Sequence, residues 1–251
     1  MAHAYFIMKE IITTFNDQTE PISTDMLKSL SPRTTTWIYI ALITVVFAVV
    51  FTYIFDPALN LGGDNCEYYM LSTSIAQGEG YVNLGNIDHK HATAFPPGYP
   101  LLMAGVRIFT DSIVAQKILN GLFLLASVVL LFLFIRRNKM QQTLALTAAI
   151  VVLLNYRVLE FATIMMSEMS YLMFSALIIY LLCLYDGKDE GRPWWKNPCL
   201  YLLILCAGYA FQIRTQGFAV VVAVAVWFLS VRKWRQAAVF AGGFFLTTLP
   251  W

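Results

Sequence analysis

The sequence is poor in charged residues. Only 13% of its 251 residues are charged, the net charge is +2 and 59% are hydrophobic. This excludes an ordinary water-soluble domain, in which about a quarter of the residues are charged. No basic patch interleaved with aromatic residues is present, so nothing favours nucleic acid as a partner. Together with a mean hydropathy of +0.64, this composition indicates a membrane protein with several spans.

Cysteine and histidine are also scarce. One of the four cysteines, Cys66, lies in a polar loop, while the others lie in or at the ends of apolar segments, and none forms a CxxC pair. This excludes a disulfide framework and gives no sign of a zinc or redox site. His89 and His91 could share a metal ion only if an extended loop brought in other ligands, so they are weak metal candidates. A solvated loop is the other interpretation.

Long apolar runs recur along the chain. A helix of about 20 apolar residues crosses the hydrocarbon of a bilayer, and alternation typical of a barrel is absent. We therefore predict an all-α bundle of about seven transmembrane helices, with loose boundaries at 37–55, 113–135, 144–159, 171–185, 200–213, 218–231 and 237–249.

Basic residues predict the orientation of the chain. If the N-terminus is cytoplasmic, twelve of the 17 basic residues face inward and five face outward, as the positive-inside rule favours. Residues 1–36 are then a polar cytoplasmic tail, residues 37–251 form the transmembrane domain and 56–112 is the first outer loop. We expect a plasma-membrane (inner-membrane) protein. No removable signal peptide is expected, and the ending "TTLPW" suggests the N-terminal portion of a longer protein.

The outer loop contains the stretch "GGDNCEYYMLSTSIAQGEG" at residues 62–80. Its apolar and small residues have helical spacing, with Asp64 placed as the N-cap, Glu67 three residues later as in a capping box, and glycines as the stop. We predict a short amphipathic helix on the membrane surface. From the residues alone, Asp64 is either a cap or a functional carboxylate.

Farther on, "FPPGYPLLMAG" predicts a rigid turn leading into a short apolar helix.

These motifs together resemble a known family. A D-x-x-x-Y pattern at Asp64 and Tyr68, the "GEGY" stop and "FPPGYPLLMAG" before the second span are similar to bacterial relatives of the dolichyl-phosphate-mannose protein mannosyltransferases. That superfamily has the GT-C fold and includes the aminoarabinose transferases of lipid A. The resemblance extends over about residues 37–251.

The resemblance implies roles for several residues. Asp64 occupies the place of the catalytic base, and Glu67, Tyr68 and Tyr99 fall in the motifs expected to bind substrate. Many members have Asp-Glu where this chain has Asp64-Asn65, which weakens the case for a divalent cation (Mg²⁺ or Mn²⁺) more than the case for the base.

Three further residues are expected at the outer ends of spans. The resemblance places Glu168 where family members have a second acidic residue in an outer loop. Equally, Glu168 could be an acid in the first turn of a helix whose N-cap is Ser167. Arg214 and, less strongly, Arg157 are candidates for phosphate contacts, because a guanidinium offers a planar set of donors. A snorkelling side chain is the other interpretation of Arg214.

The sequence therefore predicts an inverting glycosyltransferase of the cell envelope. A polyprenyl-phosphate sugar would be the donor, and a glycan, lipid or protein would be the acceptor. A base and a positive charge near the phosphate suffice, since the donor already has a good leaving group. The alternatives are a transporter or flippase, which would favour inverted repeats and mid-membrane charges, and a non-catalytic truncated homologue.

Overall fold

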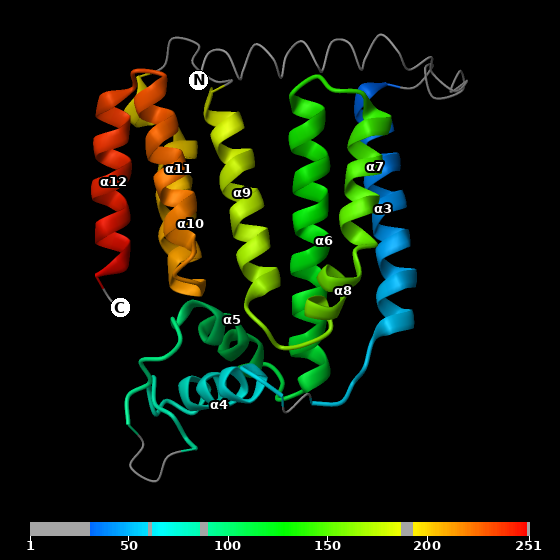
Figure 1. The fold of residues 1–251 in the computed structure, drawn as a ribbon, viewed down its shortest axis with the longest axis vertical. Helices are drawn as coiled ribbons and strands as arrows, with labels where there is room; N and C mark the ends of the chain where they lie inside the picture. Colours follow the sequence, from blue (N-terminus) through cyan, green and yellow to red (C-terminus); the bar gives the residue numbers. More distant parts are fainter. Residues whose placement is uncertain (1–30, 60–61, 86–89, 187–192, 250–251) are drawn as a thin grey trace.

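The chain folds as a row of upright helices with two short helices lying across one end (Figure 1). This computed structural model describes residues 31–59, 62–85, 90–186 and 193–249. Within those ranges the regular structure is helical, and Val82 and His91 form an isolated antiparallel bridge. The elements are α3 (Pro32–Ile54), α4 (Asn65–Ala76), α5 (Gly98–Arg107), α6 (Ile113–Arg137), α7 (Gln142–Leu153), α8 (Tyr156–Ala162), α9 (Glu168–Asp186), the 3₁₀ turn η1 (Trp194–Lys196), α10 (Pro198–Ile213), α11 (Gly217–Ser230) and α12 (Trp234–Thr248).

The expected all-helical bundle is confirmed, and each predicted span overlaps one of its upright helices. In the described residues, α3, α6 and α9 are each long and apolar enough to cross a membrane. The pair α7 and α8 would be a fourth span if counted together, and α10 and α11 are apolar but have only 16 and 14 residues.

The predicted span at 144–159 is not one straight helix. It breaks after α7, and α8 continues at an angle of 62°. The cause is Asn155, whose side-chain oxygen accepts hydrogen bonds from the backbone N–H groups of Arg157 and Val158 and so starts a new helix.

The two helices of the predicted outer loop, α4 and α5, lie where their glycine and proline signals indicate. α4 ends before Gly78 and Gly80, which have φ of 79° and 86°, values that glycine adopts without strain. α5 begins at Gly98 and so includes Pro100, which is tolerated in the first helical turn because no intrahelical partner is needed there.

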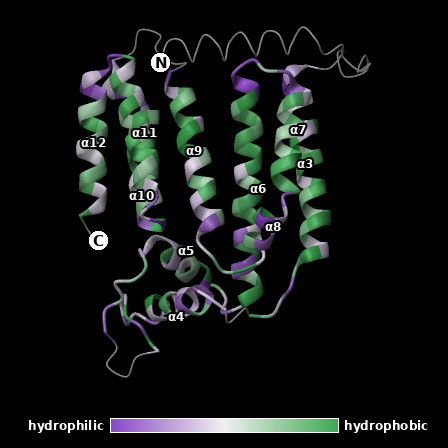
Figure 2. Ribbon diagram, in the orientation of Figure 1, coloured by the Kyte–Doolittle hydropathy of each residue, from purple (hydrophilic) through white to green (hydrophobic). Residues whose placement is uncertain are grey.

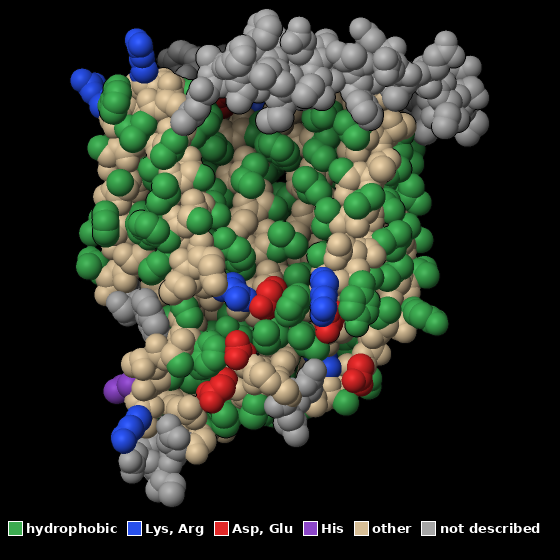
Figure 3. Space-filling view, viewed as in Figure 1, with side chains coloured by type: hydrophobic (Ala, Val, Ile, Leu, Met, Phe, Trp, Pro, Cys, Tyr) green, Lys and Arg blue, Asp and Glu red, His purple; other side chains and the backbone are tan. Residues whose placement is uncertain are grey.

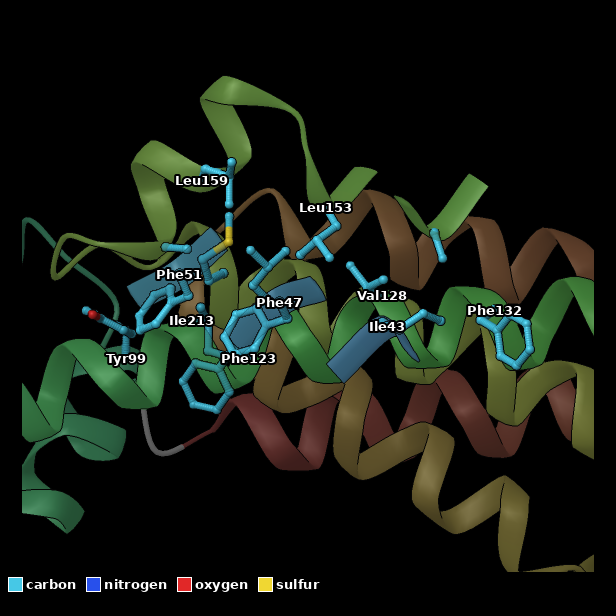
Figure 4. Close-up of a cluster of buried hydrophobic side chains, with 14 of the residues drawn as sticks. Ile43, Phe47, Phe51, Tyr99, Phe123, Val128, Phe132, Leu153, Leu159 and Ile213 are labelled. Atoms are coloured by element: carbon cyan, nitrogen blue, oxygen red, sulfur yellow. The ribbon is translucent and has the colours of Figure 1, made fainter. Parts of the chain in front are cut away.

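Two buried clusters hold the bundle together. The first lies among α3, α6, α7, α8 and α9 and includes Tyr68 of α4 and Tyr99 of α5 (Figure 4). The second lies among α9, α10, α11 and α12. Because aromatic side chains of α4 and α5 belong to the first cluster, these two helices are packed onto the bundle as part of one core.

The outer faces of the bundle are apolar (Figure 2). Val49 of α3 is 66% exposed and Phe245 of α12 is also 66% exposed. Soluble monomers rarely expose large contiguous apolar surfaces, whereas lipid tails cover them at little cost. The helices therefore present a lipid-facing belt.

Gly98, the glycine of the PPGYP turn, packs directly on the end of α10. A Cβ atom at this position would lie 2.6 Å from the carbonyl carbon and oxygen of Gln212, and the Tyr209 hydroxyl donates to the Gly98 carbonyl at 2.9 Å. The backbones of α5 and α10 approach this closely because residue 98 has no side chain.

Gly98→Ala is expected to destabilise the protein by about 1–3 kcal/mol, because the backbone atoms that the methyl group would meet have little room to shift. Thermal unfolding of the purified protein in detergent measures the change. Gly105→Ala on the same helix is the matched control, since a Cβ atom there meets nothing within 4 Å. Equal unfolding temperatures for the two variants would contradict the close approach.

Candidate active site

Asp64 stands at the first position before α4, but its side chain does not cap the helix. It makes no capping hydrogen bond, and in the described residues its carboxylate has no hydrogen-bond or ion-pair partner. Glu67 Oε2 accepts a bond from Asn83 Nδ2 at 3.1 Å. The capping-box prediction is therefore wrong, and the Asp64 carboxylate is half-buried and available for chemistry.

Asn65, the neighbour of Asp64, turns inward. It is 4% exposed and its Nδ2 donates to the Gly62 carbonyl at 2.8 Å. Gly63, between them, has φ of 60°. The amide of Asn65 therefore fixes the turn that presents Asp64.

Tyr68 links α4 to the start of α9. Its hydroxyl lies 3.1 Å from Ser167 Oγ, and its ring packs edge-on against Tyr99 with centroids 4.8 Å apart. Burial raises the pKa of the Tyr68 hydroxyl above its ordinary value; the Ser167 hydrogen bond and the Arg214 charge lower that pKa in part, and the charges of Asp64 and Glu168 raise it. The hydroxyl therefore stays protonated and lies near both carboxylates.

Glu168 and Arg214 form an ion pair at the same end of the bundle. Glu168 Oε1 of α9 lies 2.5 Å from Arg214 Nη1, just past α10, and the side chains are 23% and 28% exposed. Arg214 Nη1 also donates to Ser167 Oγ at 3.2 Å, and its Nε donates to Gln216 Oε1 at 3.2 Å. The second carboxylate oxygen of Glu168 is buried and has no hydrogen-bond partner among the described residues. Glu168 is thus more than a first-turn acid, and a partly exposed guanidinium faces the site.

Tyr99 is fully buried beneath this group. Its hydroxyl donates to Asn120 Oδ1 at 3.2 Å, and Asn120 Nδ2 donates to the carbonyls of Ile164 and Met166. Burial raises the Tyr99 pKa well above its ordinary value. Tyr99 and Asn120 therefore support the loop before α9, and the contact of Tyr99 with substrate stays a prediction.

Two predicted candidates lie apart from this group. Arg157 is exposed and pairs with Glu160 of its own helix at 2.8 Å, and no interaction joins it to Arg214 or Asp64 in the described residues. His91 is exposed, and His89 falls outside the described residues. Their predicted roles stay predictions.

Asp64 and the acidic residues near it do not form a binding site for a divalent cation. Among the described residues no three His, Cys, Asp or Glu side chains are grouped as metal ligands. Residue 65 is an asparagine whose side chain points inward, and the Glu67 carboxylate accepts a hydrogen bond from Asn83. These side chains do not fit a tightly held divalent ion, so we assign no step to one.

Sequence reasoning did not find the connecting role of two residues of the site. Ser167 and Asn120 join the loop before α9 to neighbouring helices, yet Ser167 was expected only as a possible helix cap and Asn120 was not singled out. An asparagine inside an apolar helix is the signal that would have pointed to Asn120. Figure 3 shows acidic and basic side chains gathered where the bundle meets α4 and α5, with an apolar band over the adjoining bundle.

A family model matches the part of the chain that follows α4. The model of the dolichyl-phosphate-mannose-protein mannosyltransferase family matches residues 94–249, more than half of the chain. The chain belongs to this family. A comparison of this mannosyltransferase-family chain with curated protein sequences found no match.

Two solved structures have the same fold. One is the Saccharomyces cerevisiae protein O-mannosyltransferase Pmt1–Pmt2 complex bound to the sugar donor, with a TM-score of 0.66 and 13% identity over 86% of this chain. The other is ArnT from Cupriavidus metallidurans bound to undecaprenyl phosphate, with a TM-score of 0.66 and 16% identity, also over 86% of this chain. The mannosyltransferase-family chain spans 32% and 41% of those chains, respectively. The GT-C fold predicted from the sequence is confirmed, as is the membrane glycosyltransferase superfamily.

Proposed function

We propose that this chain carries the donor site and catalytic base of a glycosyltransferase that uses a polyprenyl-phosphate sugar. The observation that carries the proposal is that Asp64, whose carboxylate has no partner among the described residues, and the Arg214 guanidinium both lie near the Tyr68 hydroxyl at one end of an apolar bundle. The sugar donor and undecaprenyl phosphate bound by the two similar structures support a donor of this class.

The reaction is a single displacement. An acceptor hydroxyl oxygen attacks the anomeric carbon of the donor, the bond from that carbon to the phosphate oxygen breaks, and polyprenyl phosphate leaves with the electron pair. Asp64 takes the hydroxyl proton, and Arg214 balances the charge of the phosphate. Because attack and departure occur on opposite faces, the sugar configuration inverts. The acceptor is a hydroxyl of a glycan, lipid or protein.

The placement of charge favours an enzyme over a transporter. In the described helices of the bundle, acidic and basic residues lie within five residues of a helix end or on the short helix α8, and the middle turns have none. A transporter commonly binds its substrate near the middle of the membrane with polar groups at that depth.

The end that carries α4 and α5 is proposed to face outward from the plasma membrane. The turns at the opposite end contain basic residues, including Arg136, Arg137, Lys139, Lys196, Arg232 and Lys233 (Figure 1). This distribution matches a cytoplasmic face.

Cysteine labelling tests the orientation in a cysteine-free background. With Gln77→Cys after α4, a membrane-impermeant maleimide is expected to label intact cells. With Asn138→Cys after α6, labelling is expected only after permeabilisation. Both positions are exposed. The reverse pattern would overturn the orientation and would place Asp64 in the cytoplasm.

The transfer itself is tested with the full gene product in membranes. A pool of labelled polyprenyl-phosphate sugars is supplied, and the release of free polyprenyl phosphate is followed, so no knowledge of the acceptor is needed. Release that depends on Asp64 supports the proposal. No release from the complete protein given a broad pool of donors would sink it.

A further inference from the structure

Ser167 lies where three parts of the candidate site meet. Its Oγ is 3.1 Å from the Tyr68 hydroxyl of α4 and 3.2 Å from Arg214 Nη1 at the end of α10. Ser167 itself immediately precedes Glu168, the first residue of α9. One hydroxyl therefore joins the helix of the proposed base to the arginine of the proposed phosphate site.

The chemistry of a serine suits this junction. A hydroxyl has one hydrogen and two lone pairs, whereas a guanidinium only donates, so Ser167 must accept from Arg214 and still has the capacity to bond Tyr68. Ser167 is 1% exposed and Tyr68 is 4% exposed, so bulk water is a poor substitute for either bond. Loss of the serine oxygen would break both links at once.

The backbone around Ser167 is fixed from both sides. Asn120 Nδ2 donates to the Met166 carbonyl at 3.1 Å, and Ser170 Oγ donates to the Ser167 carbonyl at 2.9 Å. The position of the Ser167 hydroxyl is therefore set by α6 and α9, the two central helices of the first core, rather than by the outer loop.

We propose that Ser167 is a positioning residue that sets the distance between the base and the phosphate-binding arginine. Through Tyr68, one helical turn after Asp64, it holds α4 in register with the bundle. Through Arg214 it gives Nη1 a second, neutral acceptor beside Glu168 and so fixes the orientation of the guanidinium. The inference rests on the proposed function, because it assigns Asp64 and Arg214 their roles in transfer.

Two variants separate these links. Ser167→Ala is expected to raise the donor KM about tenfold and to lower kcat about tenfold, because a hydrogen bond to a charged group and the register of α4 are both lost. Tyr68→Phe is expected to lower kcat about tenfold with the donor KM unchanged, since the Arg214 contact remains. The double variant is expected to be no worse than Ser167→Ala, because both changes break the same chain of bonds.

Matched controls remove the same atoms at other positions. Ser127→Ala deletes a buried hydroxyl of α6 that donates to the Phe123 carbonyl of the same helix, and Tyr209→Phe deletes a tyrosine hydroxyl that donates to the Gly98 carbonyl. Both are expected to leave donor KM and kcat within about twofold of wild type. A merely structural role for Ser167 would reduce the amount of active protein, and so the apparent kcat, without changing the KM.

A binding measurement distinguishes failure of this inference from failure of the proposed function. Undecaprenyl phosphate alone is titrated against the full gene product in nanodiscs. Weaker binding by Ser167→Ala, with normal binding by Ser127→Ala, supports the Arg214 link whether or not turnover is seen. If Ser167→Ala matches wild type in binding and turnover while Asp64→Asn is inactive, the inference is overturned and the proposed function stands. If Ser167→Ala does not fold, Tyr68→Phe still decides through its kcat.

Discussion

Asp64→Asn is expected to slow the release of polyprenyl phosphate by about a thousandfold, the middle of the range for loss of a general base. Asparagine has nearly the same size and shape as aspartate but does not accept a proton. In the described residues the Asp64 carboxylate makes no hydrogen bond that the substitution would break, so the fold is expected to remain intact. Release assays on membranes with equal amounts of protein measure the effect.

Binding of undecaprenyl phosphate provides the internal check on Asp64. The variant is expected to bind this probe as tightly as wild type does, because the base contacts the acceptor rather than the phosphate. Asp56→Asn is the matched control at the same end of the bundle, since its Oδ1 accepts from the Ala58 N–H and an asparagine keeps that bond. Equal release by Asp64→Asn and wild type would remove Asp64 from the mechanism.

Local signals were sufficient to predict the two helices α4 and α5, although not the way in which α4 begins. The glycines after α4 and the prolines before α5 act through backbone geometry that depends on few neighbours, so their helices appear where the sequence placed them. The break before Asn155 was missed, because one capping side chain within an apolar run is a weak signal beside the hydrophobicity of the whole segment.

Which residues make up the candidate site was harder to predict from the sequence than where the site lies. Arg157 and Arg214 have the same chemistry and were both expected at outer helix ends. The partner of Arg157 is Glu160, three residues along the same helix, which is a contact that sequence spacing can predict. The partner of Arg214 is Glu168, on another helix, so only the packing of α9 against α10 brings the two together. The role of Ser167 was equally hard to predict from the sequence, because it depends on contacts with two segments that are distant along the chain.

Arg214→Gln is expected to raise the donor KM by 10- to 100-fold, which corresponds to the loss of about 1.5–3 kcal/mol for charge-assisted hydrogen bonds to a phosphate. Glutamine keeps much of the side-chain length but has no positive charge. The substitution also leaves the partly buried Glu168 carboxylate without its cation, so we expect a loss of stability of about 1 kcal/mol, less than for a fully buried pair. Kinetics with varied donor concentration and thermal unfolding measure the two effects separately.

The double variant Arg214→Gln/Glu168→Gln separates stability from binding. Removing both charges is expected to restore most of the unfolding temperature, because no unpaired carboxylate remains, while the donor KM stays high because the phosphate still has no cation. Arg157→Gln is the control, since that guanidinium is 75% exposed and pairs within its own helix, so a change in donor KM below about threefold is expected. A larger increase in KM for Arg157→Gln than for Arg214→Gln would move the phosphate site to α8 and leave the Glu168–Arg214 pair as a purely structural link between α9 and α10.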